Sequence, residues 1–160
     1  MDLTIPGFSL HYFKAVREYG CHTGDWSLAE EVYPKLKSIL NTFIAQRKNE
    51  LVCRFAGTNH WNFYDWSPYL DGLPRGAKDA IPDLMINALF ILALTNLREI
   101  DKMLGKVFAY EALLQESKAR TKAAFYNERT GLFSMTSGGA EYTVLGNSLA
   151  ILAGLTKQDE

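Results

Sequence analysis

Apolar residues recur at steps of three and four along most of this 160-residue sequence, a spacing that places them on one face of an α-helix. The clearest run lies within residues 28–44, where the positions that follow this spacing are Leu28, Val32, Leu36, Ile39, Leu40, Phe43 and Ile44. The stretch Leu84–Leu94 is instead apolar nearly all round, which is typical of a helix buried on most sides. The sequence therefore predicts an all-α protein.

Five helices are predicted, and capping or stop residues mark most of their ends. Their approximate ranges are Ser9–Tyr19, a second from Asp25 or Ser27 to Ile44, then Pro82–Leu104, Val107–Tyr126 and Thr143–Ala153. Gly20, Gly105 and Gly154 are the expected C-terminal stops of the first, third and fifth helices, because glycine adopts the left-handed conformation at little cost. Ser27 and Glu30 have the spacing of a capping box at the start of the second helix.

Short and long connections alternate between these helices. Residues 21–26 and 105–106 are short links, whereas residues 49–81 and 127–142 form loops of a length that is usually functional inside a compact domain. The fourth helix has a charged side opposite an apolar side, which is expected to comprise Phe108, Ala112, Leu113, Ala119, Ala123 and Ala124. Inner apolar helices and outer surface helices are therefore expected to form antiparallel hairpins with every long loop at one end. A funnel-shaped site is expected there, beside the N-termini of the inner helices.

The composition excludes several classes of partner. Apolar residues make up 48% of the chain and charged residues 22%, which is enough to build a core. Seventeen Lys and Arg against 18 Asp and Glu give a net charge of −1, so we expect neither nucleic acid nor an anionic membrane as a partner. Leu84–Leu94 is too short to span a bilayer, and no signal peptide is visible, so a cytoplasmic location is expected.

Cysteine and histidine residues show no recognisable metal-binding pattern. His11, Cys21, His22, Cys53 and His60 lack the spacing of known zinc motifs, so neither a metal nor another cofactor is expected. Two cysteines make no disulfide framework, and reduced thiols are the default in the cytoplasm.

The first long loop concentrates aromatic and polar side chains between residues 59 and 72. It holds two of the three tryptophans with further rings, carboxylates and amides: Asn59, Trp61, Asn62, Phe63, Tyr64, Asp65, Trp66, Tyr69 and Asp71. Carbohydrate sites use this mixture, because aromatic faces cover the C–H side of a pyranose while carboxylates and amides bind its hydroxyls. The alternative is that the rings only pack the loop onto the end of the bundle, and that Asp65 only shapes a turn.

A pattern distributed over nearly the whole chain carries a family resemblance. Its segments are Ile5–Leu10, Arg17–Tyr19, Thr23–Asp25, Val32–Lys37, Trp61–Trp66, Asn87–Leu89 and Gly146–Leu155. The specific element among them is the Trp-x-x-x-Asp-Trp motif of residues 61–66. The chain resembles the catalytic domain of bacterial α-L-rhamnosidases, glycoside hydrolase family 78, within the six-hairpin glycosidases. The resemblance implies an (α/α)6 toroid, of which residues 1–160 would supply a partial domain of about two and a half antiparallel helical hairpins.

The same resemblance implies roles for some residues and shows which groups are missing. Trp61, Asp65 and Trp66 would belong to the wall that binds a rhamnose ring, without moving protons. In such rhamnosidases one carboxylic acid protonates the leaving oxygen and a carboxylate activates water, so that the anomeric centre is inverted. The general acid lies in an acidic segment upstream of Ile5–Leu10, and the general base is a glutamate downstream of Gly146–Leu155. No catalytic residue is therefore assigned in this chain, and the isolated chain is expected to be inactive.

Other interpretations stay open. The parent could be a different (α/α)6 carbohydrate-active enzyme, such as a glucosidase, trehalase or sugar epimerase relative. Helical hairpins also form protein-binding modules, although the sequence has no fixed-period repeat of the tetratricopeptide or HEAT kind. Glu141 is a further candidate for the site, because its loop is expected to open on the same end as Asp65. A partial toroid would expose the apolar faces of Leu84–Leu94 and Leu149–Leu155, so self-association is expected, for example as a dimer.

Overall fold

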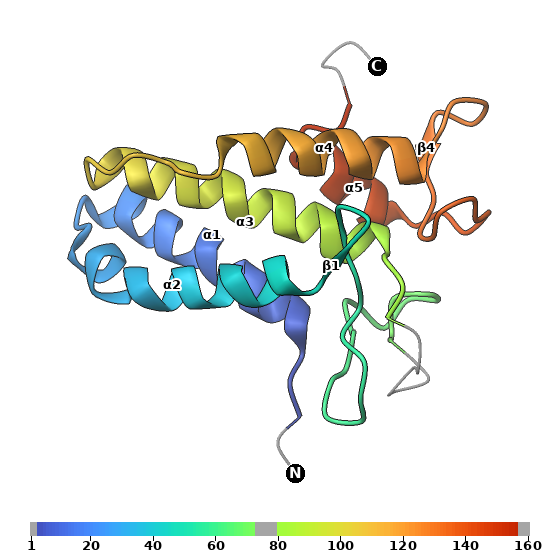
Figure 1. Ribbon diagram of the computed structural model, residues 1–160, viewed down its shortest axis with the longest axis horizontal. Coiled ribbons are helices and arrows are strands. Elements are labelled where there is room, and N and C mark those ends of the chain that lie inside the picture. The colour runs from blue at the N-terminus through green and yellow to red at the C-terminus, as the bar shows by residue number, and fades with distance from the viewer. Residues whose placement is uncertain (1–2, 73–79, 157–160) are drawn as a thin grey trace.

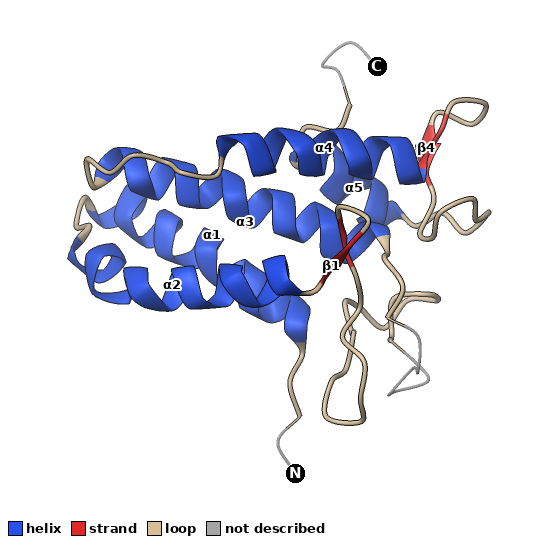
Figure 2. Cartoon of the chain, viewed as in Figure 1, coloured by secondary structure: helices blue, strands red, loops and turns tan. Residues whose placement is uncertain are grey.

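The computed structural model of the protein describes residues 3–72 and 80–156. Five helices make up most of this part of the chain: α1 (Pro6–Thr23), α2 (Ser27–Ala45), α3 (Leu84–Met103), α4 (Glu111–Phe125) and α5 (Val144–Leu152) (Figure 1). Two-residue strands form two small antiparallel pairs, β1 (Arg47–Lys48) with β2 (Leu51–Val52) and β3 (Tyr126–Asn127) with β4 (Leu132–Phe133) (Figure 2). The predicted all-α class is confirmed, and the two strand pairs are additions that the sequence did not reveal.

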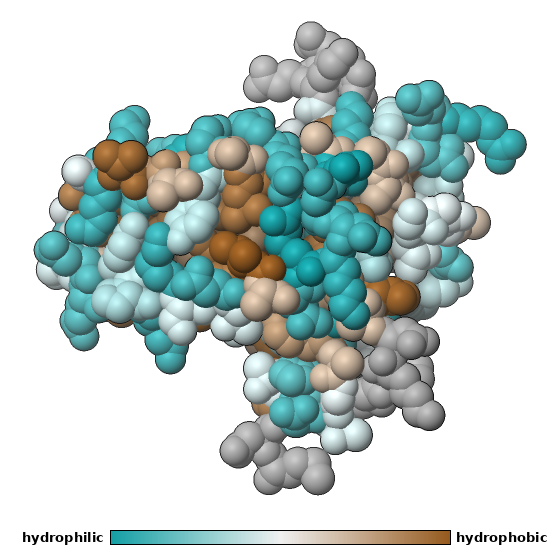
Figure 3. Space-filling view, viewed as in Figure 1, coloured by the Kyte–Doolittle hydropathy of each residue, from teal (hydrophilic) through white to brown (hydrophobic). Residues whose placement is uncertain are grey.

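The helices form two layers. Helices α1, α3 and α5 pack side by side in an inner layer, while α2 packs on α1 and α4 packs on α3 in an outer layer. Short connections join inner to outer helices at one end of the molecule, and both long loops lie at the opposite end, on the right in Figure 1. The predicted order of inner helix, short turn, outer helix, long loop and inner helix is therefore confirmed. Figure 3 shows one face of the molecule, on which hydrophilic residues predominate along the outer helices.

Helix α3 lies at the centre of the core. Every residue of Leu84–Leu94 is buried except Leu92, which is half-buried. The expectation that this stretch presents an apolar surface is therefore wrong, because α1, α4 and α5 cover it. Within the inner layer, apolar exposure is greatest on α5, where Val144, Ile151 and Leu152 are 87%, 61% and 69% exposed.

Helix α1 extends beyond its predicted range at both ends. It begins at Pro6, which suits a first helical turn because the missing N–H would have no helical partner there. It passes Gly20 and ends at Thr23, where Gly24 adopts a left-handed conformation with φ 74°. The prediction that Gly20 ends this helix is wrong. Gly20 is buried, and a Cβ at this position would lie 2.7 Å from the Trp26 indole, so the glycine serves the close approach of a ring.

The start of α2 differs from the predicted capping box. Trp26 is the capping residue and Ser27 is already the first residue of the helix, so the Ser27 hydroxyl makes no cap with Glu30. The Ser27 amide instead donates to Oδ1 of Asp25 at 2.9 Å. An aspartate two residues upstream thus satisfies the free amide that the capping box was expected to serve.

Helix α3 begins at Leu84, two residues after the predicted start at Pro82. Asp83 caps this helix, because its Oδ1 accepts the Ile86 amide at 2.8 Å while its own backbone is extended. Pro82 lies before the cap, in an isolated antiparallel β-bridge with Cys53. For α5 the observed start is within one residue of the predicted start at Thr143. This helix begins at Val144, and the Thr143 hydroxyl caps it by accepting the Gly146 amide at 3.0 Å.

Helix α4 begins at Glu111 and not at Val107, and its buried face also differs from the prediction. The buried residues are Leu114, Ser117, Thr121 and Phe125, whereas most of the alanines assigned to that face are exposed. Leu114 and Phe125 bury far more apolar area than alanine side chains, so their positions determine which face turns to α3. In the described residues no helix has the length and apolarity that crossing a membrane requires.

Candidate functional site

Residues 53–72 form the first part of the loop end, and backbone hydrogen bonds attach them to the start of the chain. Thr4 pairs with this segment by donating to the Asn59 carbonyl and accepting the Trp61 amide, both at 2.9 Å. Within the segment, the Asn62 side chain brackets Phe55, accepting its amide at 3.0 Å and donating to its carbonyl at 2.9 Å. These contacts position the segment that carries the Trp-x-x-x-Asp-Trp motif.

Three aromatic rings of this segment pack on one another. The ring centroids of Trp61 and Phe63 are 4.7 Å apart, those of Phe63 and Trp66 are 4.8 Å apart, and those of the two tryptophans are 5.7 Å apart. Trp61 is held further by its indole N–H, which donates to the Asp71 carbonyl at 2.6 Å. Phe63 is buried, but Trp66 is 75% exposed. The cluster therefore supports an indole that faces solvent.

Asp65 lies directly beside this exposed indole in the chain. The Ser67 hydroxyl donates to Oδ2 of Asp65, and this bond together with the Trp66 amide lowers the pKa of the Asp65 carboxyl. The turn that follows is closed by the Leu70 carbonyl, which accepts the amides of Tyr64 and Asp65 at 2.8 and 3.2 Å. Asp65 is therefore an ionised carboxylate at neutral pH, suited to accept hydrogen bonds.

A buried ionic network lies beneath the aromatic segment. Asp83, which is fully buried, forms an ion pair with Nε of Arg54 and accepts the Tyr64 hydroxyl at 3.1 and 3.2 Å. Burial and the Asp83 charge raise the pKa of Tyr64 well above its ordinary value, so its phenol stays neutral. Because Asp83 also caps α3, the network joins the loop segment to the N-terminus of an inner helix.

Residues 134–143 form the second part of the loop end. The Met135 amide donates to the Glu141 carbonyl at 2.8 Å, and the Met135 carbonyl accepts the Leu84 amide at 3.0 Å, which holds this loop against α3. A Cβ on Gly139 would meet the Thr136 hydroxyl at 2.4 Å and Oε2 of Glu141 at 2.7 Å. The loop thus leaves no room for a side chain at position 139, and the Thr136 hydroxyl and the Glu141 carboxylate both lie close to this glycine.

Two clefts open between these loop segments. The first cleft, of about 590 Å³, is lined by residues that include Asp65, Ser67, Tyr69, Tyr142 and Ser148. The second cleft, of about 210 Å³, is lined by Arg54, Tyr69, Asp71, Gly72, Met135, Thr136 and Glu141. Volumes of a few hundred Å³ are typical of small-ligand sites. Two clefts that share Tyr69 therefore open at the loop end, where the sequence predicts a site.

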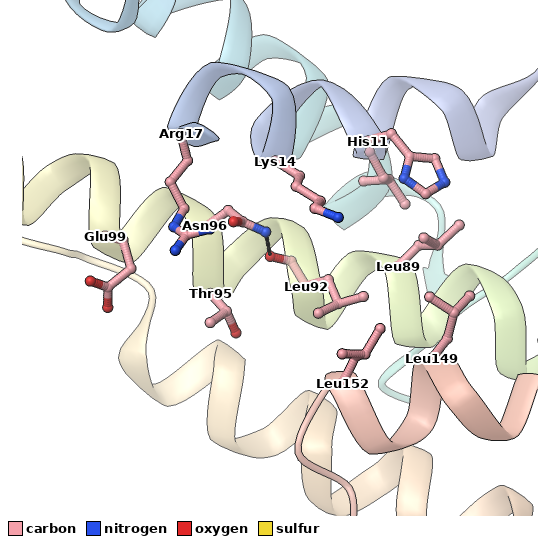
Figure 4. Close-up of a pocket in the computed structure, with 11 residues that line it drawn as sticks. His11, Lys14, Arg17, Leu89, Leu92, Thr95, Asn96, Glu99, Leu149 and Leu152 are labelled. Atoms are coloured by element: carbon pink, nitrogen blue, oxygen red, sulfur yellow. Dashed lines mark hydrogen bonds between the residues drawn. The ribbon is translucent and has the colours of Figure 1, made fainter. Parts of the chain in front are cut away.

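A third hollow, here called the inner groove, lies away from the loop end along α1, α3 and α5 (Figure 4). It has a volume of about 300 Å³ and an apolar floor that includes Leu89, Leu92, Leu149 and Leu152. Charged and polar side chains of α1 and α3 line its other part: His11, Lys14, Arg17, Thr95, Asn96 and Glu99. Burial lowers the pKa of His11, and the Lys14 charge lowers it further.

The residues considered as metal ligands remain apart. Across residues 3–72 and 80–156, no three His, Cys, Asp or Glu side chains gather as a metal site would require. Cys21 is exposed and Cys53 is buried, both as free thiols. His60 lies on the loop and packs against the Phe55 ring, with ring centroids 5.3 Å apart.

The three residues predicted for sugar binding lie on one loop segment, but neither tryptophan lines the clefts described above. Trp61 and Trp66 are in ring contact, and Asp65 lines the first cleft. Glu141 opens on the same end as expected, but it lines the second cleft. Sequence reasoning missed Arg54 and Tyr142. The sequence does indicate Tyr142, because this residue directly precedes Thr143, the cap of a predicted inner helix, and the site is expected beside the N-termini of these helices.

Helical hairpins in two layers, with clefts at the loop end beside the inner helix N-termini, define a fragment of an α/α toroid. A family model described as the bacterial alpha-L-rhamnosidase 6 hairpin glycosidase domain matches residues 7–160, and the chain belongs to this family.

A solved structure of the same class has a similar fold. It is described as the crystal structure of a family 78 rhamnosidase of Bacillus sp. GL1, and the two chains are 21% identical with a TM-score of 0.75. The alignment covers 98% of this chain and 16% of that one, so this chain spans a small part of the length of that rhamnosidase. Comparison with curated proteins finds no match.

Proposed function

We propose that this chain forms part of the rhamnose-binding wall of an α-L-rhamnosidase-like glycosidase. The observation that carries the proposal is the exposed Trp66 indole, which packs against the rings of Phe63 and Trp61. The Trp66 ring packs on Phe63 and Trp61 but leaves most of its surface in solvent, and an exposed aromatic face can cover the C–H side of a pyranose. Family membership and the fold of the Bacillus rhamnosidase support the same assignment.

Asp65 would bind sugar hydroxyls in this proposal and would not transfer protons. Its lowered pKa keeps the carboxyl ionised at neutral pH, and an ionised carboxylate cannot protonate a leaving oxygen. It can, however, accept hydrogen bonds from vicinal hydroxyls, which are stronger when the acceptor is charged. Trp61 would support the wall by holding both Trp66 and the Asp71 backbone.

The parent enzyme would hydrolyse terminal α-L-rhamnosides by the inverting mechanism. That mechanism needs a general acid and a general base on opposite faces of the ring. We assign neither role to a residue of this chain, and the isolated chain is proposed to bind sugar without cleaving it. A cytoplasmic location is part of the same proposal, because Cys21 and Cys53 form no disulfide and cysteines without a disulfide are typical of a reducing compartment.

The binding proposal is tested by titration calorimetry of the 160-residue chain with methyl α-L-rhamnoside. The wild-type chain should bind, and Trp66→Ala and Asp65→Ala should each weaken binding by about tenfold or more. Tyr19→Ala, which removes another exposed ring at the far end of α1, is the matched control and should bind as the wild type does. A wild-type chain that fails to bind the rhamnoside overturns the proposal.

Inactivity of the isolated chain needs a separate measurement. Release of nitrophenol from 4-nitrophenyl α-L-rhamnoside should be no faster with the wild-type chain than with Asp65→Ala. Hydrolysis above that control would show that this chain carries its own acid and base.

We also propose that two copies of this chain associate through the inner groove and the adjoining face of α5. A two-fold interface requires a self-complementary surface. The inner groove has cations on α1, Lys14 and Arg17, and an anion on α3, Glu99, on the margins of an apolar floor. Exposed Ile151 and Leu152 of a second copy would cover that floor.

Light scattering over a range of concentrations tests this association. The wild-type chain should form dimers, Leu152→Glu should shift it to monomers, and Leu132→Glu should not, since Leu132 is an exposed leucine on β4 outside the groove. A wild-type chain that stays a monodisperse monomer at high concentration contradicts the proposal.

A further inference from the structure

Helix α5 lines both the first cleft and the inner groove. Val144, Leu145 and Ser148 line the first cleft. Leu149 and Leu152 line the inner groove, and Figure 4 shows both leucines on the groove side of this helix. One helix of nine residues is therefore a wall of the proposed sugar site and a wall of the proposed interface between two copies.

A small apolar hollow of about 170 Å³ connects these two walls. It shares Leu145 with the first cleft. It shares His11, Leu89 and Leu149 with the inner groove. The first cleft, the small hollow and the inner groove are therefore adjacent to one another.

The accessible side of α5 is a single stripe. Val144, Ser148 and Leu152 recur at steps of four, which places them above one another on one side of an α-helix, and all three are exposed. Gly146 and Ala150 are buried on the opposite side. A protein surface that contacts Leu152 therefore reaches the mouth of the first cleft along the same stripe.

A stable interface is larger than the distance between the groove and the cleft. Val144 and Leu152 lie about 12 Å apart along the helix axis, at a rise of about 1.5 Å per residue. A standard interface covers about 800 Å² on each partner, which corresponds to a round patch with a radius of about 16 Å. A patch of this size centred on Leu152 extends beyond Val144 and covers the first cleft.

The charges at the margins of the inner groove suit a second copy of this chain as the occupant. Lys14 and Arg17 line the groove from α1, and Glu99 lines it from α3. A two-fold arrangement can place Glu99 of each copy beside the two cations of the other copy. Exposed Ile151 and Leu152 then cover the apolar floor.

We propose that the second copy closes the first cleft, so that self-association and rhamnoside binding exclude each other. Because the interface is two-fold, both clefts are closed in the dimer. The sugar then shifts the equilibrium towards monomers, and linkage requires that association weakens sugar binding in return. This inference rests on the proposed sugar binding and the proposed association, and it adds that each opposes the other.

Sedimentation equilibrium measures the dimer dissociation constant of the 160-residue chain with and without methyl α-L-rhamnoside. At a rhamnoside concentration about ten times its own dissociation constant, the dimer dissociation constant should rise about a hundredfold, because sugar must leave both clefts before a dimer forms. Sucrose at the same concentration is the control for co-solute effects. Leu132→Glu should respond to the rhamnoside as the wild type does.

Titration calorimetry measures the reverse effect. The rhamnoside affinity of the wild type should fall as the chain concentration rises above the dimer dissociation constant. Leu152→Glu should bind at every concentration with the affinity that the wild type has at high dilution. Ile151→Glu is a second variant of the same exposed face and should behave as Leu152→Glu does.

The outcomes separate this inference from the two proposals beneath it. If the wild type dimerises and binds the rhamnoside, but the dimer dissociation constant changes by less than about twofold, the inference is wrong while both proposals stand. If the rhamnoside strengthens the dimer, the inference is also wrong, because the second copy then completes the sugar site. If the wild type binds no rhamnoside or stays monomeric, the inference fails together with the corresponding proposal.

Discussion

Asn87 on α3 and Asn147 on α5 make the same three hydrogen bonds in successive hairpins. Asn87 accepts the Val52 amide at 2.8 Å and donates to the Val52 carbonyl at 2.9 Å and the Asp83 carbonyl at 2.8 Å. Asn147 makes the equivalent bonds to Phe133 at 2.8 and 3.1 Å and to the Thr143 carbonyl at 3.0 Å. In each hairpin, one side-chain amide joins the second short strand to the capped first turn of the inner helix.

Replacement of either asparagine should therefore destabilise the chain. Asn87→Ala leaves the Val52 amide and carbonyl buried without a partner, and each such group costs about 1–3 kcal/mol. Asn147→Ala should cost less, because Asn147 is only half-buried. Urea unfolding monitored by circular dichroism measures both, with Asn41→Ala on the exposed side of α2 as the control. Equal stability of Asn87→Ala and the control would contradict the structural role.

The second prediction concerns Gly20, where alanine should destabilise the chain although alanine has the higher helix propensity. Alanine is more favourable than glycine inside a helix by about 1 kcal/mol, but a Cβ at position 20 would lie 2.7 Å from the Trp26 ring. Gly20→Ala should therefore lower the free energy of unfolding by about 1–3 kcal/mol, as overpacking does. In the Trp26→Ala background the same change should be neutral or stabilising. Additive effects of the two changes would show that the close contact is not the cause.

The predicted and observed helices differ at their ends, because the ends depend on tertiary contacts such as that between Gly20 and Trp26. Helical spacing is a local property, so the existence and order of all five helices were predictable from the sequence. The ends depend on contacts between side chains from different elements, or on which of two neighbouring residues caps the first turn of the helix. Gly20 stays helical where Trp26 covers it, and α3 begins after Asp83 because the Asp83 carboxylate accepts the Ile86 amide while it also pairs with Arg54. The strands were not predictable, since two residues show no periodicity and their pairing depends on Asn87 and Asn147.

The stability of the chain should fall at alkaline pH because of two tyrosines. Burial raises the pKa of Tyr33, as does its hydrogen bond to Asp101 at 2.6 Å, and burial and the Asp83 charge raise that of Tyr64. The unfolded chain loses these protons near the ordinary pKa of 10.0 and the folded chain loses them at higher pH. Stability is therefore complete below pH ~10 and falls as the pH rises above it.

Urea unfolding at pH ~8 and pH ~10.5 measures this dependence, since tyrosine titrates between them. Tyr33→Phe and Tyr64→Phe should each reduce the loss of stability between the two values. Tyr19→Phe, on an exposed ring, should leave it unchanged. If Tyr33→Phe and Tyr64→Phe lose as much stability as the wild type, other groups cause the alkaline transition.

The candidate site was predictable only where its residues are close in sequence. Trp61, Asp65 and Trp66 fall within one short motif; in the structure the two tryptophan rings are in contact, while Asp65 lines the first cleft. Arg54 and Glu141 meet at the second cleft from different loops, and no local pattern reveals that contact. The strained backbone of Tyr69 was equally hidden, because a tyrosine gives no indication of a positive φ.

The ion pair beneath the site gives the last prediction. Asp83→Asn keeps a side chain that can cap α3, but it leaves the Arg54 charge without its buried partner, and breaking a buried pair costs about 3–5 kcal/mol. Because Arg54 is partly exposed, the cost should fall at or below the lower end of this range. In the Arg54→Met background, Asp83→Asn should cost much less, since no cation is then left unpaired. Urea unfolding of the wild type, both single variants and the double variant gives the coupling energy between the two side chains. A coupling energy near zero would mean that Asp83 stabilises the chain only by capping α3 and binding Tyr64.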